Sequence, residues 1–182
     1  MAIIYKVNLF FLLEHPTGSS MYSARIIRKG GLDLDIAKAE SSDLLNILEL
    51  QYEAYQSEAE IYGEMIPPLK QTIGELEEEF KEGIILKAAV HGEIVGSVRA
   101  KIQDEVCLIG KLIVKPQYQN QGIGQRLMKA IEEAHGHLKR IELFTGHKST
   151  RNLALYHKLG YRIYKEEEVN EDLTMVYMYK EV

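Results

Sequence analysis

The hydrophobic positions of this chain follow two periods, which divide it into predicted strands and helices. Residues 84–90, 94–102 and 106–114 are apolar runs containing many β-branched side chains, and short polar turns separate them. Runs of this length and composition between turns are typical of strands. The same pattern predicts strands over 32–37, 140–144, 161–165 and 173–180, with a charged loop over 166–172 between the last two.

The first predicted helix follows the 32–37 strand. Ser41 or Ser42 is placed to cap its N-terminus, and the Pro67-Pro68 pair is expected to stop it. Its apolar face is expected to consist of Leu44, Leu45, Ile47 and Leu48.

Capping residues and helical spacing predict three further helices. The second begins at Thr72, where Glu75 three residues later completes a capping box. The third covers 123–134, and the fourth is capped by Ser149 or Thr150. Strands and helices in this order predict an α/β fold with a mixed sheet.

A polar turn with two glycines, Gln119 to Gly124, joins the 106–114 strand to the 123–134 helix. Glycines allow a ligand to approach the backbone closely, and the free N–H groups of a first helical turn favour an anion. The turn therefore predicts a phosphate or pyrophosphate site. It lacks the Lys-Ser/Thr of a Walker A loop, and Leu127 stands where a dinucleotide fingerprint has its third glycine.

Two motifs in the chain resemble those of the GNAT acetyltransferase superfamily. The Gln-x-x-Gly-x-Gly pattern of 119–124, preceded by Leu112-Ile113-Val114-Lys115-Pro116, is similar to the acetyl-CoA pyrophosphate loop of that family. About thirty residues later, a second group resembles the family's other cofactor motif. It consists of Asn152, Ala154, Tyr156, Lys158, Leu159, Gly160 and Tyr161. The resemblance covers about residues 32–180.

The resemblance implies the GNAT fold, a mixed and mostly antiparallel central sheet flanked by helices. It also implies acetyl-CoA as co-substrate and direct attack by a primary amine of a small-molecule or peptide acceptor. The implied cofactor-binding residues are Leu112, Ile113, Val114, Gln119, Asn120, Gln121, Gly122, Ile123, Gly124, Gln125, Asn152 and Tyr156. Backbone groups of the first three would pair with the pantetheine arm, while Tyr156 would act catalytically as the general acid for the leaving thiolate. The alternative for Tyr156 is a core tyrosine anchored by a hydrogen bond.

The sequence does not identify the general base. Some family members have a glutamate where this chain has Leu108. The remaining candidates are Glu142 and His147 beside the 140–144 strand, and Glu58, Glu60 and Tyr62 on the acceptor side. An amine that arrives neutral, or a water chain, would need none of them.

Two other functions compete with catalysis. One is an acyl-CoA-binding or sensor module that keeps the fold with little or no transfer activity. The other is a different nucleotide-binding α/β protein that uses the 119–124 loop for its phosphate. Turnover with thiol release separates the first from an enzyme, and comparing acetyl-CoA with ATP and NAD as ligands separates the second.

Composition and charge argue against a nucleic-acid-binding, membrane-spanning or metal-binding protein. The net charge of −5 argues against a nucleic-acid partner, and no apolar run approaches the 18 residues of a membrane span. A single cysteine, Cys107, lies in an apolar strand and is expected to be a buried small hydrophobe. His135 and His137 are expected to be solvated side chains at a helix end, so no metal site is predicted. These features indicate a cytoplasmic protein.

Residues 1–31 precede the family-like region and form a predicted leader, with the acetyltransferase domain over 32–182. The leader contains four consecutive apolar residues, Phe10 to Leu13, and a turn-forming break at 16–20. Such a run favours being covered, and a partner in a homodimer is one candidate for the cover.

Overall fold

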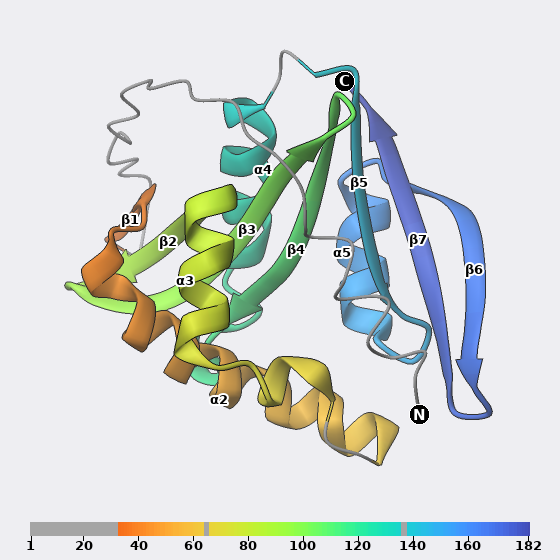
Figure 1. The fold of residues 1–182 in the computed structure, drawn as a ribbon, viewed down its shortest axis with the longest axis horizontal. Helices are drawn as coiled ribbons and strands as arrows, with labels where there is room; N and C mark the ends of the chain where they lie inside the picture. Colours follow the sequence, from red (N-terminus) through yellow and green to blue (C-terminus); the bar gives the residue numbers. More distant parts are fainter. Residues whose placement is uncertain (1–32, 64–65, 136–137) are drawn as a thin grey trace.

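The protein forms one seven-stranded mixed sheet with helices on both faces (Figure 1). The computed structural model describes residues 33–63, 66–135 and 138–182, so the leader predicted over 1–31 lies outside the described residues. The strand order is β1-β2-β3-β4-β5-β7-β6, and every neighbouring pair is antiparallel except the parallel pair β4–β5. The predicted fold class, mixed and mostly antiparallel, is confirmed.

The strands lie close to their predicted positions, with one clear error. Their bounds are β1 Leu34–Lys38, β2 Ile84–Val90, β3 Glu93–Gln103, β4 Val106–Val114, β5 Arg140–Gly146, β6 Arg162–Asn170 and β7 Leu173–Glu181. The charged loop predicted over 166–172 was wrong, because β6 continues through its acidic residues as an edge strand. Edge strands tolerate charged side chains, and Lys165 bonds Glu167 at 2.6 Å along this one.

In the described part of the chain, four α-helices and three short 3₁₀ turns connect the strands. The helices are α2 Leu44–Tyr62, α3 Ile73–Glu82, α4 Ile123–Ala134 and α5 Thr150–Lys158, and the 3₁₀ turns are η2 Ser41–Asp43, η3 Pro67–Leu69 and η4 Pro116–Tyr118. Helices α2 and α3 cover one face of the sheet, while α4 and α5 lie behind it (Figure 1).

The first helix differs from its prediction at both ends. Neither predicted serine caps it, since Glu40 and Asp43 form the capping box that starts η2, and the Glu40 N–H donates to Asp43 at 2.7 Å. Leu45, predicted to be on the apolar face, is 62% exposed. The helix ends before the prolines at Gly63, whose φ of 67° is left-handed, a common helix terminator.

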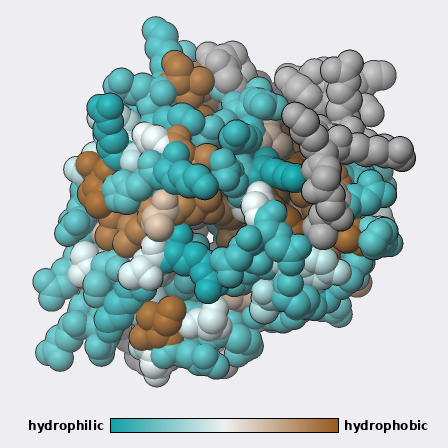
Figure 2. Space-filling view, turned by 180° about the vertical axis from the view of Figure 1, so that it is seen from behind, coloured by the Kyte–Doolittle hydropathy of each residue, from teal (hydrophilic) through white to brown (hydrophobic). Residues whose placement is uncertain are grey.

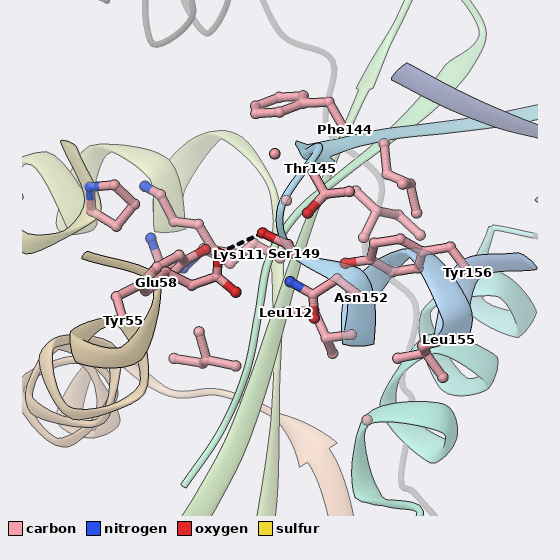
Figure 3. Close-up of a pocket in the computed structure, with 18 of the residues that line it drawn as sticks. Tyr55, Glu58, Lys111, Leu112, Phe144, Thr145, Ser149, Asn152, Leu155 and Tyr156 are labelled. Atoms are coloured by element: carbon pink, nitrogen blue, oxygen red, sulfur yellow. Dashed lines mark hydrogen bonds between the residues drawn. The ribbon is translucent and has the colours of Figure 1, made fainter. Parts of the chain in front are cut away.

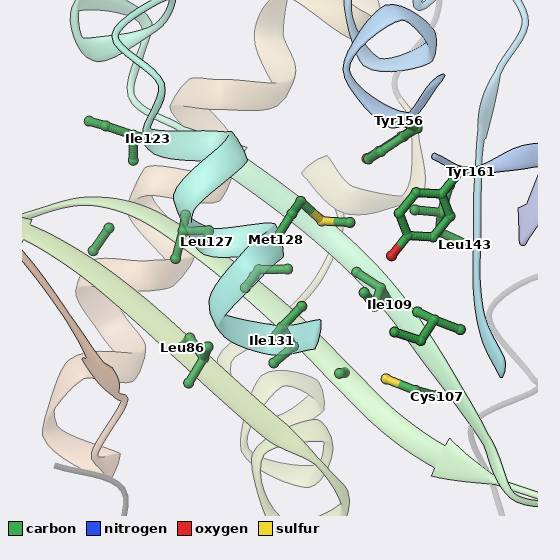
Figure 4. Close-up of a cluster of buried hydrophobic side chains, with 14 of the residues drawn as sticks. Leu86, Cys107, Ile109, Ile123, Leu127, Met128, Ile131, Leu143, Tyr156 and Tyr161 are labelled. Atoms are coloured by element: carbon green, nitrogen blue, oxygen red, sulfur yellow. The ribbon is translucent and has the colours of Figure 1, made fainter. Parts of the chain in front are cut away.

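Side chains of adjacent strand residues point to opposite faces of the sheet and pack into two separate hydrophobic cores, one on each face. Ile85 of β2 joins the smaller cluster under α2 and α3, and its neighbour Leu86 joins the larger cluster under α4 and α5. Figure 4 shows Leu127, Met128 and Ile131 of α4 packed on the sheet in that larger cluster. Seen from behind, the surface is mainly hydrophilic, with apolar side chains in small separated groups (Figure 2). Among the described helices, none is long and apolar enough to cross a membrane.

The cap of α3 provides a stability test. The Glu75 N–H donates to the Thr72 hydroxyl at 3.3 Å, and the Thr72 N–H donates to the Glu75 carboxylate at 2.7 Å. Thr72→Ala should lower the free energy of unfolding by about 1 kcal/mol in a urea titration, as for other lost N-caps. Ser41→Ala and Ser42→Ala are the controls and should each cost less than about 0.5 kcal/mol, as surface substitutions do. Equal losses at Thr72 and at either serine would contradict this assignment of the caps.

Candidate active site

A cleft opens where β4 and β5 part. The two strands pair only from Val106 and Arg140 to Ile109 and Leu143. Beyond that point β4 pairs with β3, and β5 pairs with β7. Both strands line a cavity of about 1520 Å³ together with α2, α5 and the start of α4. The edge of β4 over 110–114 is therefore left without a strand partner on its β5 side within the described chain.

A β-bulge bends β4 at the point where it leaves β5. Ser97 pairs with Ile113, but Arg99 pairs with Gly110, so one residue of β3 lies opposite Lys111 and Leu112 together. Lys111 has a φ of 48°, which is left-handed and uncommon for a side-chain-bearing residue in a strand. A bulge of this kind bends and twists the strand that carries it.

The predicted phosphate loop has the conformation of an anion site. Asn120 and Gly122 are both left-handed, with φ of 61° and 79°, and Gly122 is the N-cap of α4. Gln119 fixes the loop to the end of β4, because its side-chain amide donates to the Val114 carbonyl at 3.1 Å. An ideal Cβ at Gly122 would meet no atom within 4 Å, so open space lies beside the first-turn N–H groups of α4. The N-terminus of the helix can therefore hold an anion.

Arg151 adds a positive charge that sequence reasoning missed. It lines the cavity from α5, and its guanidinium donates to the Gln119 side chain. Its position between the predicted cap and Asn152, at the start of a helix beside the loop, was the available signal.

Asn152 and Tyr156 project from α5 toward the cavity, as Figure 3 shows. Tyr156 is only 6% exposed, and its ring meets Tyr161 edge to face at 6.0 Å. No hydrogen bond joins its hydroxyl to any described residue, which argues against a tyrosine anchored in the core. Burial raises the pKa of Tyr156, and the neighbouring Tyr55 and Glu58 raise it further. The phenol is therefore protonated at neutral pH.

A hydrogen-bond bridge crosses the cleft from α2 to the start of α5. Ser149 occupies the N-cap of α5 but makes no side-chain capping bond; its hydroxyl instead donates to the Glu58 carboxylate at 2.5 Å (Figure 3). The prediction that its side chain caps the helix was wrong because this partner is distant in sequence. The Tyr62 hydroxyl accepts from the Lys148 N–H at 3.0 Å and strengthens the same bridge.

The five base candidates occupy different environments. Glu142 is bonded to Arg140 at 2.6 Å and accepts from Tyr164 at 2.7 Å. His147 is exposed, and its Nδ1 accepts from the Thr174 N–H at 3.0 Å. Glu60 is an exposed part of the cavity rim, while Tyr62 serves the bridge. Glu58 lines the cavity, and no described cation forms an ion pair with its carboxylate.

A buried polar network, unpredicted from the sequence, lies beside the cavity and contributes Glu79, Arg99 and Lys111 to its lining. Its members are Gln51 of α2, Gln71 and Glu79 at α3, Arg99 of β3 and Lys111 of β4. Lys111 and Arg99 lower the pKa of Glu79 against the opposing effect of burial. Charged residues inside two otherwise apolar strands were the signal that such a network exists, because buried charges need partners.

The remaining chemical candidates lie away from the cleft. Cys107 is fully buried as predicted, and burial raises the pKa of its thiol to about 12. The prediction that His135 is solvated was wrong. Its side chain is buried, and its Nδ1 lies 2.9 Å from the Ile131 carbonyl oxygen. His137 lies outside the described residues. Within 33–63, 66–135 and 138–182, no three His, Cys, Asp or Glu side chains converge as metal ligands.

Comparison with known proteins decides the family. The model of the acetyltransferase (GNAT) family matches residues 43–161, which is more than half of the chain. The chain belongs to the GNAT acetyltransferase family. The resemblance found in its two sequence motifs is thereby confirmed.

Individual relatives of this GNAT chain are distant. UPF0157 protein YqkA of Bacillus subtilis (strain 168) is 24% identical over 124 residues, which are 68% of this chain and only 36% of YqkA. The chain thus spans about a third of that curated relative.

Two solved structures share the fold. PaiA N-acetyltransferase from Thermoplasma acidophilum, in complex with coenzyme A, has a TM-score of 0.70 at 18% identity, covering 82% of this chain and 99% of PaiA. YncA from Salmonella typhimurium, with its cofactor acetyl-CoA, has a TM-score of 0.65 at 15% identity, covering 81% of this chain and 93% of YncA. At these identities the likeness concerns the fold alone.

The bridge across the cleft can be tested at Gly146. An added Cβ there would collide with the Tyr62 phenol. Gly146→Ala should therefore lower the free energy of unfolding by about 1–3 kcal/mol, as overpacking does. In a Tyr62→Leu background the same change should cost less than about 1 kcal/mol, since the collision is gone. Gly124→Ala is the control because its Cβ would meet Leu155 at an ordinary 3.6 Å. Equal costs of Gly146→Ala in both backgrounds would refute the contact.

Proposed function

We propose that this chain is an N-acetyltransferase that moves the acetyl group of acetyl-CoA to a primary amine. The observation that carries the proposal is the free edge of β4 over 110–114, which is followed, after η4 and the 119–122 loop, by a helix start that can hold an anion. A free strand edge suits the amides of a pantetheine arm, and the helix start suits the pyrophosphate at its end. The coenzyme A in the PaiA structure and the acetyl-CoA in the YncA structure support this choice of donor.

The predicted donor residues fit this arrangement. Backbone groups of Leu112–Val114 would pair with the pantetheine arm, and Asn152 would hydrogen-bond it from α5. The N–H groups of Gln121–Gln125 would hold the pyrophosphate, with Arg151 and Gln119 beside it. Bound acetyl-CoA supplies an acetyl group activated as a thioester. That range includes the predicted contacts Gly122, Ile123 and Gly124, and Asn120 precedes it in the same loop.

Glu58 is the residue we assign to the incoming amine. Its carboxylate lines the cavity and is oriented by the Ser149 hydroxyl, which leaves further lone pairs for an ammonium. A carboxylate without a competing cation can bind the ammonium and accept its proton before attack. Glu142, by contrast, is already held by Arg140 and Tyr164.

Tyr156 is the residue we assign to the leaving group. Its hydroxyl faces the cavity (Figure 3), and Glu58 lies close enough to raise its pKa. Because burial raises the pKa of its phenol, Tyr156 is protonated in the working pH range. It can therefore donate a hydrogen bond to the sulfur as negative charge develops there. We assign to it the role of general acid for the departing thiolate.

A binding or sensor module is the second candidate, because a low-activity relative could keep the same cleft. Release of free thiol from acetyl-CoA, measured across amino acids, polyamines, aminoglycosides and peptide N-termini, separates the two. Acceptor-dependent thiol release supports the enzyme, whereas tight acetyl-CoA binding without release supports the module. Stabilisation against heat by ATP or NAD, but not by acetyl-CoA, would refute both.

The role of Tyr156 gives the kinetic prediction. Tyr156→Phe keeps the ring and removes the hydroxyl, so kcat should fall roughly 10²-fold or more, the range for one proton donor. Acetyl-CoA affinity should change little in calorimetry. The matched control is Tyr161→Phe, because that buried hydroxyl donates to Glu132 at 2.9 Å, in the core and away from the cleft. If Tyr156→Phe keeps the wild-type rate when chemistry limits turnover, Tyr156 is a structural core residue and not the general acid.

A further inference from the structure

The buried network beside the cavity contains more positive charge than its structural role needs. Arg99 is by itself sufficient to connect α2 and α3 to the sheet. It donates to Gln51 at 2.6 Å, to Gln71 at 3.0 Å and to Glu79 at 2.6 Å. These bonds fasten α2, the segment before α3, and α3 itself to β3. The network would be complete without Lys111.

Lys111 repeats contacts that already exist. Its ammonium donates to Gln71 at 3.0 Å and to Glu79 at 2.5 Å, the same two side chains that Arg99 holds. The strand that carries it is already fixed by the β3–β4 ladder. Burying a second cation costs desolvation free energy, and here it ties down no further element.

Lys111 shares its ion-pair partner with Arg99. Among the described residues, Glu79 is the one carboxylate that forms ion pairs with both Arg99 and Lys111. The nearby Glu82 pairs with Lys101, and Glu75 is bonded to Thr72 in the cap of α3. Burial together with Arg99 lowers the pKa of Lys111 to about 8, against the opposing effect of Glu79 and Glu75. A further anion in contact with the ammonium would give Lys111 an ion-pair partner of its own.

Lys111 belongs to the lining of the cavity, so an anion bound in the cavity could reach its side chain. Lys111 lines the cavity with 17% of its side chain exposed, and only two of its three N–H donors are used by the network. The preceding Gly110 also lines the cavity, and an ideal Cβ there would meet no atom within 4 Å. Figure 3 shows Lys111 lining the same pocket as Tyr55 and Glu58 of α2 and Ser149 at the start of α5.

We propose that the acceptor carries a carboxylate close to its amine, and that Lys111 binds this carboxylate while Glu58 receives the amine. The proposal rests on the function proposed above and names its substrate class, a zwitterion of the amino-acid type. A singly charged carboxylate would give Lys111 an ion-pair partner that it does not share with Arg99. Opposite charges on two walls of one cavity would orient the acceptor and discriminate against plain amines.

Matched acceptor pairs test the proposal. The probes are the common α-amino acids, β-alanine and γ-aminobutyrate, each compared with its carboxamide, which has the same shape but no charge. The wild-type protein should show kcat/KM at least about ten-fold higher for the best acid than for its amide, the value of one charge-assisted hydrogen bond. Lys111→Met should abolish that preference and change turnover of the amide less than about three-fold. Lys111→Arg should restore part of the preference.

The control and the binding assay separate the possible outcomes. Lys87→Met removes another half-buried lysine, paired with Asp43 outside the cavity lining, and should leave the preference unchanged. The same acceptor pairs are titrated calorimetrically into the CoA-loaded protein, which cannot transfer an acetyl group. Carboxylates that bind in a Lys111-dependent manner without turnover would support this site and refute the proposed activity. If amides are used as well as acids, the result supports the activity and overturns the site. The absence of carboxylate binding in both assays would also overturn the site.

Discussion

The parting of β4 from β5 after Ile109 and Leu143 is the constraint on which the rest of this structure depends. Beyond this point β4 remains paired with β3, and β5 remains paired with β7. Each strand therefore keeps the backbone hydrogen bonds on one of its edges after the two separate. The bulge at Lys111 bends β4 at the same point. The result is a cavity inside a continuous sheet, with a free strand edge on one wall.

The helices hold this opening in a defined shape. Behind the sheet, α4 follows β4 after η4 and a short loop, and its first turn lines the cleft. In front of it, α2 and α3 are fastened by Arg99, and the far end of α2 reaches α5 through Glu58 and Ser149. The same bonds that position these helices also place a carboxylate, a phenol and an ammonium around one cavity. Stability and chemistry are therefore built from shared contacts.

Local features of the chain could be predicted well from its sequence. The bounds of β2, β4 and α4 follow from hydrophobic period and turn residues, and the Thr72 capping box needs only four residues in a row. The Gln119–Gly124 loop and the spacing of Asn152 and Tyr156 led to the right family.

The errors and omissions involve partners far apart in the chain. The side chain of Ser149 was expected to cap its own helix but bonds Glu58, some ninety positions earlier. The network of Arg99 and Lys111 joins four elements, and no local pattern states which charges meet. β6 was cut short because its acidic run resembles a loop until β7 pairs with it.

Hydrogen–deuterium exchange with and without saturating acetyl-CoA tests the central claim most directly, because it reports on backbone amides. The account predicts slower exchange in two segments, the free edge of β4 over 112–114 and the loop and helix start over 119–125. The end of α4 over 131–134, which lies outside the lining of the cavity, should not change. Unaltered exchange in both segments at saturation, or protection confined to another part of the molecule, would contradict it.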